Sequence, residues 1–206
     1  MISSKYKFVF VHIPKTGGSS IESAFGYNLW DKKTFGSNYY NYDLALGLCP
    51  ITKRYLQHLT MHEIESLSKN KIDNYFRFAF VRNPWSRAVS DYLFYTQGKT
   101  VTFKDFLLKP NECMPNQIDP AHLMEQHHFI CDENNNLMVD FLGRFESLQQ
   151  DFDIISDRIN CPRQQLPHNN KSCLQGSYKS YYNQETYDIV KQKFAQDIKL
   201  FNYKFN

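Results

Sequence analysis

The sequence has no long hydrophobic run. No stretch of its 206 residues approaches the roughly 20 apolar residues that a transmembrane helix requires. Its first residues, Met1-Ile-Ser-Ser-Lys-Tyr-Lys7, lead directly into a short apolar segment and lack the three-part pattern of a signal peptide. We therefore expect a cytoplasmic protein without a signal peptide or a transmembrane segment.

Closely paired cysteines are missing as well. The five cysteines are odd in number, widely spaced and without a Cys-x-x-Cys pair: Cys49, Cys113, Cys131, Cys161 and Cys173. Such a set is typical neither of a disulfide framework nor of a thiolate zinc site, and reduced thiols are the default in the cytoplasm. We therefore expect no bound metal.

The sequence has little excess charge of either sign. A net charge of +3 is too small to indicate a nucleic-acid or membrane-surface partner. The hydrophobic fraction of 42% and the charged fraction of 22% are ordinary for one soluble domain, which we expect to span residues 1–206. Aromatic residues reach 16%, and because many lie inside apolar runs, an aromatic core is favoured over a carbohydrate- or base-stacking surface.

The remaining pattern alternates strands and helices. Segments 7–13 and 76–81 are almost continuously apolar, as expected for strands buried on both faces of a parallel sheet. Thr60 and Glu63 have the spacing of a helix capping box. The expected third strand is 137–145, and the expected helices are 19–26, 60–69, 84–95, 102–108, 146–159 and 183–201. Segments 27–51, 110–120 and 166–180 are expected to be irregular. The fold class is therefore α/β with a mainly parallel sheet.

An anion-binding loop is predicted directly after the first strand, at His12-Ile-Pro-Lys-Thr-Gly-Gly-Ser-Ser20. Gly17 and Gly18 allow backbone N–H groups to approach an anion, and Lys15 supplies a positive charge. Hydroxyl donors are available from Thr16, Ser19 and Ser20. The helix that follows directs its N-terminus towards the same place.

The loop is not a Walker A motif. In that motif the lysine follows the glycines, whereas Lys15 precedes them. This order argues against an ordinary ATPase or GTPase and favours another anion-transfer cofactor.

A second anion site is predicted at the end of the second strand. Arg82 leaves that strand, and Ser90 lies eight residues later, about two helical turns along the next helix. The alternative is that Arg82 caps the sheet through a carboxylate and Ser90 lies on the helix surface. Two anion sites at the ends of two parallel strands suit a bis-phosphorylated nucleotide that crosses a topological switch point.

Both segments resemble the cofactor motifs of a known enzyme family. His12-Ile-Pro-Lys-Thr-Gly-Gly-Ser-Ser20 and Phe80-Val-Arg-Asn-Pro-Trp-Ser-Arg-Ala-Val-Ser-Asp-Tyr92 are similar to the two motifs of sulfotransferases that use 3′-phosphoadenosine 5′-phosphosulfate (PAPS). The branch resembled is sulfotransferase family 2, which contains the heparan, chondroitin and dermatan O-sulfotransferases. Arg144-Phe-Glu-Ser-Leu148 and the C-terminal helix also resemble this branch. The resemblance implies a P-loop-like fold of three layers, with helices on both faces of the sheet.

The resemblance also implies roles for individual residues. Residues 15–20 would bind the 5′-phosphosulfate, with Lys15 neutralising charge on the bridging oxygen as the sulfuryl group leaves. Arg82 and Ser90 would hold the 3′-phosphate. Arg87 either assists them or forms a surface ion pair, and we expect the ion pair. Lys171 and Ser172 lie in a segment that resembles a loop closing over the nucleotide, with exposed loop residues as the alternative. No metal is required, because lysine and backbone donors can stabilise the developing charge.

The base that accepts the hydroxyl proton is expected to be a histidine. His58 lies between the two motifs, where related carbohydrate sulfotransferases carry a catalytic histidine, and His62 is the alternative. His12 is expected to shape the anion-binding loop. His127 and His128 either line the acceptor cleft or only flank a strand.

The favoured function is transfer of a sulfuryl group from PAPS to a hydroxyl, most plausibly of a saccharide or glycolipid, by an enzyme peripheral to a membrane-bound glycan pathway. The alternatives are a P-loop-like kinase for a small metabolite and a non-catalytic nucleotide-binding module. The short chain favours a small or exposed acceptor, or a partner protein that completes the site. Protein tyrosine and lipid-linked glycans remain open as acceptors, and the oligomeric state is open.

Overall fold

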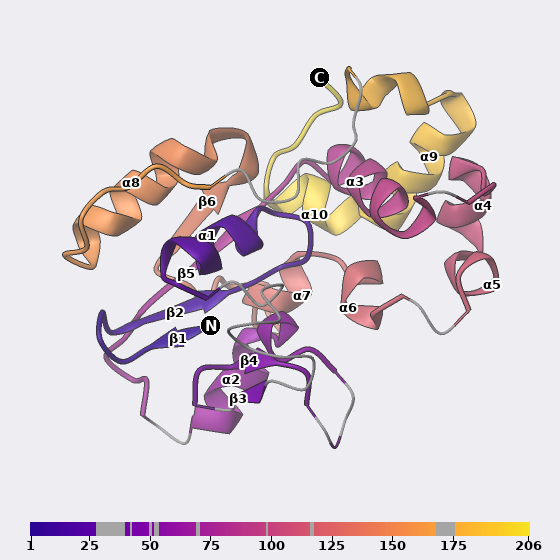
Figure 1. The fold of residues 1–206 in the computed structure, drawn as a ribbon. Coiled ribbons are helices and arrows are strands. Elements are labelled where there is room, and N and C mark those ends of the chain that lie inside the picture. Colours follow the sequence, from indigo (N-terminus) through magenta and orange to yellow (C-terminus); the bar gives the residue numbers. More distant parts are fainter. Residues whose placement is uncertain are drawn as a thin grey trace.

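A four-stranded sheet organises the chain (Figure 1). The computed structural model describes residues 1–27, 40–41, 43–49, 51, 54–68, 71–97, 99–115, 118–167 and 176–206. The strand order is β1 (Ile2–Ser3), β2 (Phe8–Val11), β5 (Phe76–Val81) and β6 (Phe141–Arg144). Strands β2, β5 and β6 are parallel and β1 is antiparallel to β2, which confirms the expected mainly parallel sheet.

Strand residues alternate between two different cores. Phe8, Phe10, Phe78 and Phe80 face α1 (Gly18–Ala24) and α8 (Leu148–Arg158) and pack with Phe152. The ring centroids of Phe10 and Phe78 lie 5.1 Å apart. Packing of rings in this core thus accounts for part of the high aromatic content.

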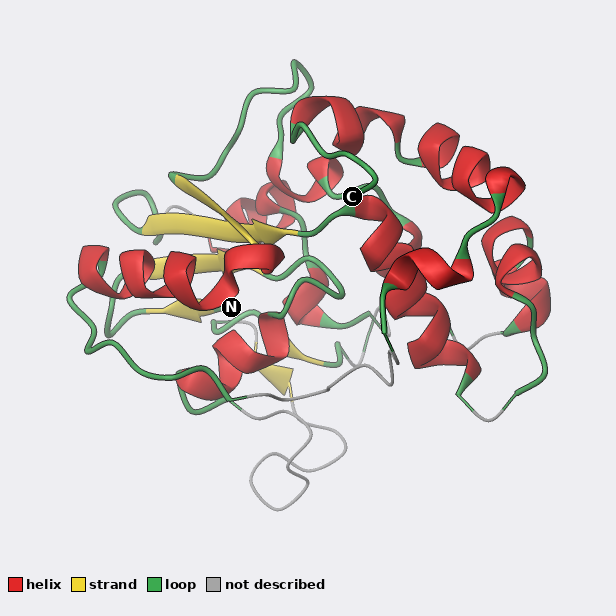
Figure 2. Cartoon of the chain, turned by 90° about the horizontal axis from the view of Figure 1, so that it is seen from above, coloured by secondary structure: helices red, strands yellow, loops and turns green. Residues whose placement is uncertain are grey.

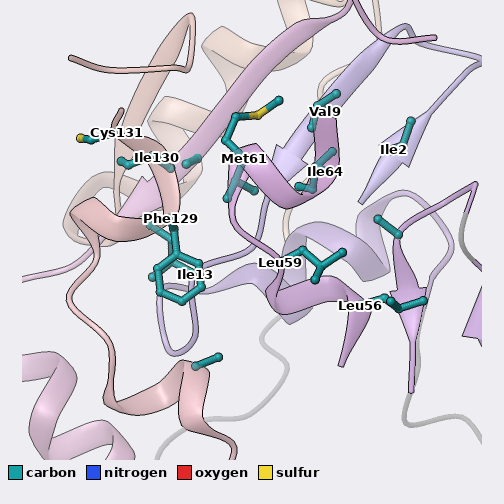
Figure 3. Packing of buried hydrophobic residues seen from close by; sticks show 14 of the residues in the cluster. Ile2, Val9, Ile13, Leu56, Leu59, Met61, Ile64, Phe129, Ile130 and Cys131 are labelled. Carbon is teal, nitrogen blue, oxygen red and sulfur yellow. The ribbon is translucent and has the colours of Figure 1, made fainter. Parts of the chain in front are cut away.

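The other face of the sheet carries smaller side chains. Its residues are Val9, Val11, Ala79 and Val81. They pack against α2 (Met61–Ser68) and α7 (His127–Ile130), and Figure 3 shows Met61 and Ile64 of α2 beside Val9. The result is the expected arrangement of three layers, with the sheet between two layers of helices.

A third cluster of helices lies beyond the end towards which the parallel strands point (Figure 2). It contains α3 (Pro84–Thr96), α4 (Phe103–Leu108) and α9 (Gln184–Lys193), which pack around Trp85, Val89, Phe103 and Val190. The helix α3 therefore connects the carboxyl end of β5 with this cluster.

Short elements complete the described part of the chain. They are β3 (Tyr40–Asn41), β4 (Leu46–Gly47), η1 (Leu56–His58), α5 (Pro110–Cys113), α6 (Pro120–Leu123), η2 (Phe145–Ser147), η3 (Tyr178–Tyr181) and α10 (Ala195–Leu200). Strands β3 and β4 pair antiparallel in a second, small sheet. Segments 27–51 and 110–120 were expected to be irregular, so β3, β4 and α5 correct that expectation.

Several expected elements have the expected bounds or caps. Strand β5 spans Phe76–Val81 as predicted. The capping box of α2 is present, since the Glu63 N–H donates to Thr60 Oγ1 at 3.2 Å and the Thr60 N–H donates to Glu63 Oε2 at 2.8 Å. Pro84 begins α3, and the side chain of Asn83 caps it.

Two expected elements differ in extent. The expected helix 183–201 is divided into α9 and α10 by Phe194, whose φ of −117° and ψ of 32° are not helical. Apolar spacing continues across this break, so the sequence pattern cannot reveal it. The expected strand 137–145 shortens to β6, and Leu137 forms only an isolated bridge with Cys131.

The described residues contain no helix long and apolar enough to cross a membrane. Cys49, Cys113, Cys131 and Cys161 form no disulfide with one another, and Cys173 lies outside the described residues.

We predict that Gly143→Ala lowers the free energy of unfolding by about 1–3 kcal/mol, because it overpacks a filled core. A Cβ at residue 143 would lie 2.5 Å from Cε1 of Phe80, whose ring is completely buried and cannot move aside. Urea unfolding at neutral pH measures the change. Ile154→Ala alters an exposed side chain of α8 and is the control, with an expected effect below about 0.5 kcal/mol.

Candidate functional site

The turn from β2 into α1 has the backbone shape of an anion nest. Lys15 has φ of +67° and Gly17 has φ of +92°, both in the left-handed region. Thr16 lies between them, and its buried hydroxyl donates to the carbonyl oxygen of Ile13 at 2.8 Å. The hydroxyl of Thr16 therefore holds the turn, and left-handed residues at positions 15 and 17 are typical of a turn whose N–H groups bind an anion.

Both glycines are required by their neighbours. A Cβ at Gly17 would lie 2.8 Å from Cδ2 of Leu148, and one at Gly18 would lie 2.1 Å from Cδ2 of His12. The ring of His12 is held there because its Nδ1 donates to Oε1 of buried Glu22 at 2.8 Å. His12 thus shapes the loop by occupying the space in front of Gly18.

Lys15 extends from this turn towards α3. Its Nζ lies 4.0 Å from the centre of the Phe94 ring, within the range of a cation–π contact. Partial burial lowers the pKa of Lys15, and the Asp91 carboxylate opposes this effect. The loop thus contributes a cation with little solvent around it, in which electrostatic interactions are stronger than in water.

Arg82, at the carboxyl end of β5, reaches the same turn. Its Nη1 donates to the carbonyl oxygen of Lys15 at 3.1 Å, and its Nε donates to Ser86 Oγ at 3.0 Å. The guanidinium also lies over the Phe145 ring, 4.0 Å from its centre. Burial lowers the pKa of Arg82 to about 10, so the side chain is charged at neutral pH. The acceptors of these hydrogen bonds are a carbonyl and a hydroxyl, so among the described residues the guanidinium does not cap the sheet through a carboxylate, contrary to the alternative considered for this residue.

The backbone of Arg82 is fixed by Gln126, which the sequence did not single out. Gln126 Oε1 accepts the Arg82 N–H at 2.8 Å, and Gln126 Nε2 donates to the Arg82 carbonyl at 2.9 Å. Gln126 is completely buried, and its own N–H donates to Asp197 at 2.7 Å. A side-chain amide that hydrogen-bonds to the backbone at the end of a strand produces no recognisable residue spacing in the sequence, so only the structure reveals it.

Ser90 is buried in α3 rather than on the helix surface, with 4% of its area exposed. Ser86 precedes Ser90 by four positions, so the two side chains lie on the same face of α3. The Arg82 side chain runs along this face, since its Nε donates to Ser86 Oγ. Within the described residues no hydrogen bond connects Arg82 and Ser90. The structure therefore places both predicted residues on one side of α3 but shows no direct contact between them.

The expectation for Arg87 was wrong. We expected a surface ion pair, but only 2% of this side chain is exposed. Its guanidinium donates to three backbone carbonyls, at 3.1 Å to Pro14, 2.9 Å to Met124 and 3.2 Å to His122. Arg87 therefore connects the anion-binding loop with the segment before α7, because three carbonyls are available there and the side chain is removed from water.

His58 lies against the loop, whereas His62 does not. His58 is buried at the end of η1, and its Nδ1 is 3.1 Å from the carbonyl oxygen of His12. Because a carbonyl can only accept, Nδ1 carries the proton and Nε2 has the free lone pair. Burial lowers the pKa of His58 well below its usual value, and nearby His12 and His122 add to this effect. His62 is exposed on α2.

A second histidine lies beside His58 and was missed by sequence analysis. His122 of α6 contacts the His58 ring edge-on at 5.4 Å between centroids, and its Nδ1 donates to Asp91 Oδ1 at 2.6 Å. Both side chains of the pair are buried. His122 lies in a segment for which the sequence predicted no element, 31 residues from Asp91, and no local motif connects the two. The structure thus places His12, His58 and His122 in one row.

Other expected residues lie elsewhere. His127 of α7 binds Asp197, and neighbouring His128 is exposed, so neither contacts His58 in the described part of the chain. Lys171 and Ser172 lie outside the described residues.

Comparison with known proteins identifies the family. The Sulfotransferase family matches residues 1–204, and the chain belongs to this family. An uncharacterized protein of Archaeoglobus fulgidus is 29% identical over 106 residues, which are 48% of this chain and 78% of that protein. No solved structure gives a significant match. Membership of the family supports sulfuryl transfer to an acceptor.

We predict that His58 makes the fold less stable in weak acid. Below about pH 6.5 the unfolded chain binds a proton at this residue that the folded protein does not, because burial lowers the folded-state pKa. Stability therefore falls as the pH falls, by up to about 1.4 kcal/mol per pH unit. Urea unfolding between pH 6.5 and 5 measures this slope.

His58→Gln should reduce that slope, while His62→Gln, which alters an exposed ring, should retain it. An unchanged slope in His58→Gln would mean that His58 is not held neutral in the folded protein.

Proposed function

We propose that the protein transfers a sulfuryl group from PAPS to a hydroxyl acceptor, most plausibly of a carbohydrate. The observation that carries this proposal is the hydrogen bond from Arg82 Nη1 to the Lys15 carbonyl at 3.1 Å. It brings together two cationic elements at the carboxyl ends of adjacent parallel strands. A ligand with phosphate groups at two positions of one nucleoside matches two such elements better than a ligand with a single phosphate chain.

The anion-binding loop suits the phosphosulfate end of this donor. Its left-handed turn offers backbone N–H groups, and residues 15–20 add Lys15 and the hydroxyls of Ser19 and Ser20. Arg82 and Ser90 suit the 3′-phosphate, with Arg82 held in place by Phe145 and Ser86. PAPS supplies an activated sulfuryl group to this site.

A cavity next to Arg82 has room for the nucleoside. Its volume is about 510 Å³, and its lining combines the aromatic rings of Phe145, Tyr178 and Tyr203 with polar and charged side chains that include Ser86, Arg144, Glu146 and Lys204. Aromatic rings can hold a base, and polar groups beside them can bind the ribose. Since Ser86 and Phe145 also contact the Arg82 guanidinium, a nucleoside in this cavity would place its 3′-phosphate near that cation.

We assign His58 as the base that accepts the proton of the acceptor hydroxyl. Its Nδ1 proton is held by the His12 carbonyl, so Nε2 is the atom that takes the acceptor proton as the acceptor oxygen bonds to sulfur. Lys15 stabilises the negative charge on the phosphate oxygen released when the old S–O bond breaks. Thr16 and Arg87 orient the loop through its carbonyls rather than through the substrate.

The carboxylates beside the loop favour this chemistry over a kinase. A kinase needs carboxylates for Mg²⁺ at the nucleotide phosphates. The two buried carboxylates nearest the histidine row are already engaged, Glu22 by His12 at 2.8 Å and Asp91 by His122 at 2.6 Å. A non-catalytic module would not need a neutral imidazole at this place.

We predict that calorimetry shows tighter binding of adenosine 3′,5′-bisphosphate than of AMP, because only the former has a 3′-phosphate for Arg82 and Ser90. Ser90→Ala should weaken the bisphosphate about tenfold by removing one hydrogen bond to a charged group, and leave AMP binding unchanged. Lys15→Ala should weaken both nucleotides. Equal affinity of the wild-type protein for the two nucleotides would refute the 3′-phosphate site.

We also predict that His58→Ala binds adenosine 3′,5′-bisphosphate as the wild type does but loses about 10²–10⁴-fold in transfer rate, the usual contribution of a general base. Transfer from PAPS to a set of p-nitrophenyl glycosides, followed by mass spectrometry, measures the rate. His122→Gln is the comparison, because His122 lies beside His58 and has its own carboxylate partner. Loss of transfer in His122→Gln alone would assign the base to His122.

A further inference from the structure

A group of three metal-ligating side chains lies outside the proposed transfer site. Glu125, His127 and His128 each offer one ligand atom, and these atoms lie within 4.8 Å of one another. They belong to α7 and the residues just before it, on the face of the sheet that also carries α2 and α10. Their donor set is two imidazole nitrogens and one carboxylate oxygen, which suits a zinc-like cation.

The carboxylate of Glu125 has one oxygen that lacks a hydrogen bond. Its Oε2 is buried and has no hydrogen-bond partner in the described part of the chain. His127 Nδ1 lies 3.8 Å from this oxygen, which is beyond hydrogen-bond distance. A buried carboxylate oxygen without a partner is costly, so a cation at this position would stabilise it.

His127 is oriented as a metal ligand by a second carboxylate. Its Nδ1 donates to Asp197 Oδ1 at 2.9 Å, which fixes the proton on Nδ1 and leaves the lone pair on Nε2. Asp197 is completely buried and also accepts the N–H groups of Gln126 and His127, so it cannot turn away. A carboxylate behind a histidine is the usual outer partner in zinc sites.

The third candidate ligand is His128. Its ring contacts the His127 ring at 4.1 Å between centroids and is exposed to solvent. Donor atoms around one zinc ion, each about 2.0–2.2 Å from it, lie closer together than 4.8 Å. His128 is the most exposed of the three residues, so its side chain is the one that is freest to adjust.

We propose that Glu125, His127 Nε2 and His128 bind one zinc ion, with water completing the coordination. This proposal does not depend on the proposed transfer reaction. The site is separated from Arg82 by Gln126, whose side chain faces the strand end. The absence of closely paired cysteines excludes only a thiolate site, so the expectation that no metal binds did not consider these three residues.

Calorimetric titration of the chelator-treated, reduced full chain with ZnCl₂ tests the proposal. One site per chain is expected, and Glu125→Gln and His128→Ala should each weaken it about tenfold or more. Both variants alter side chains that are at least partly exposed, and retained thermal unfolding without zinc checks that each one folds. His62→Ala, which removes an exposed histidine of α2, is the matched control and should bind as the wild type does.

Two further readouts locate the ion. Zinc should raise the unfolding temperature of the wild type more than that of Glu125→Gln, because binding to the folded state stabilises it. Cobalt should give a visible ligand-field band that is lost in His128→Ala. Absence of single-site binding in the wild type, or equal affinity in the wild type and both ligand variants, would overturn the proposal. Binding that persists in the ligand variants and disappears on thiol alkylation would assign the ion to cysteines instead and would also overturn it.

Discussion

The buried guanidinium of Arg82 is the constraint on which the rest of the site depends. A charged group removed from water needs partners on every side, and here they come from distant parts of the chain. The Lys15 carbonyl, Ser86 and the Phe145 ring surround the guanidinium, while Gln126 holds the backbone of Arg82. The anion-binding loop, α3, η2 and the segment before α7 are therefore fixed relative to one another by the side chain and the backbone of one residue.

A row of three histidines begins at His12, in the motif of the anion-binding loop. His12 and His122 each have a buried carboxylate, whereas the hydrogen-bond partner of His58 among the described residues is a backbone carbonyl. Protonation of His58 is consequently opposed by burial and by both neighbours. The site thus combines fixed cations for an anion with a neutral imidazole that has a free lone pair, which is the combination that transfer to a hydroxyl requires.

The sequence predicted those features that depend on local pattern. Strand 76–81, the capping box of α2 and the glycine-rich turn follow from apolar runs, cap spacing and glycine geometry. Arg87, Gln126 and His122 act instead through partners that lie 31 to 73 residues away. Most of these partners are backbone groups, which every residue carries. No pattern of residue types in the sequence could therefore predict these contacts.

The anion-binding loop and the assigned base are coupled through His12. Its ring fills the space that makes glycine necessary at residue 18, its Nδ1 binds Glu22, and its carbonyl fixes the proton of His58. A replacement of the His12 side chain would therefore disturb the entry into α1, whereas the carbonyl that accepts from His58 Nδ1 would remain. Because both contacts come from one residue at the end of β2, the loop that receives an anion and the imidazole that receives a proton are held next to each other. The first motif of this chain thus specifies more than an anion site, since it also determines which nitrogen of His58 is free.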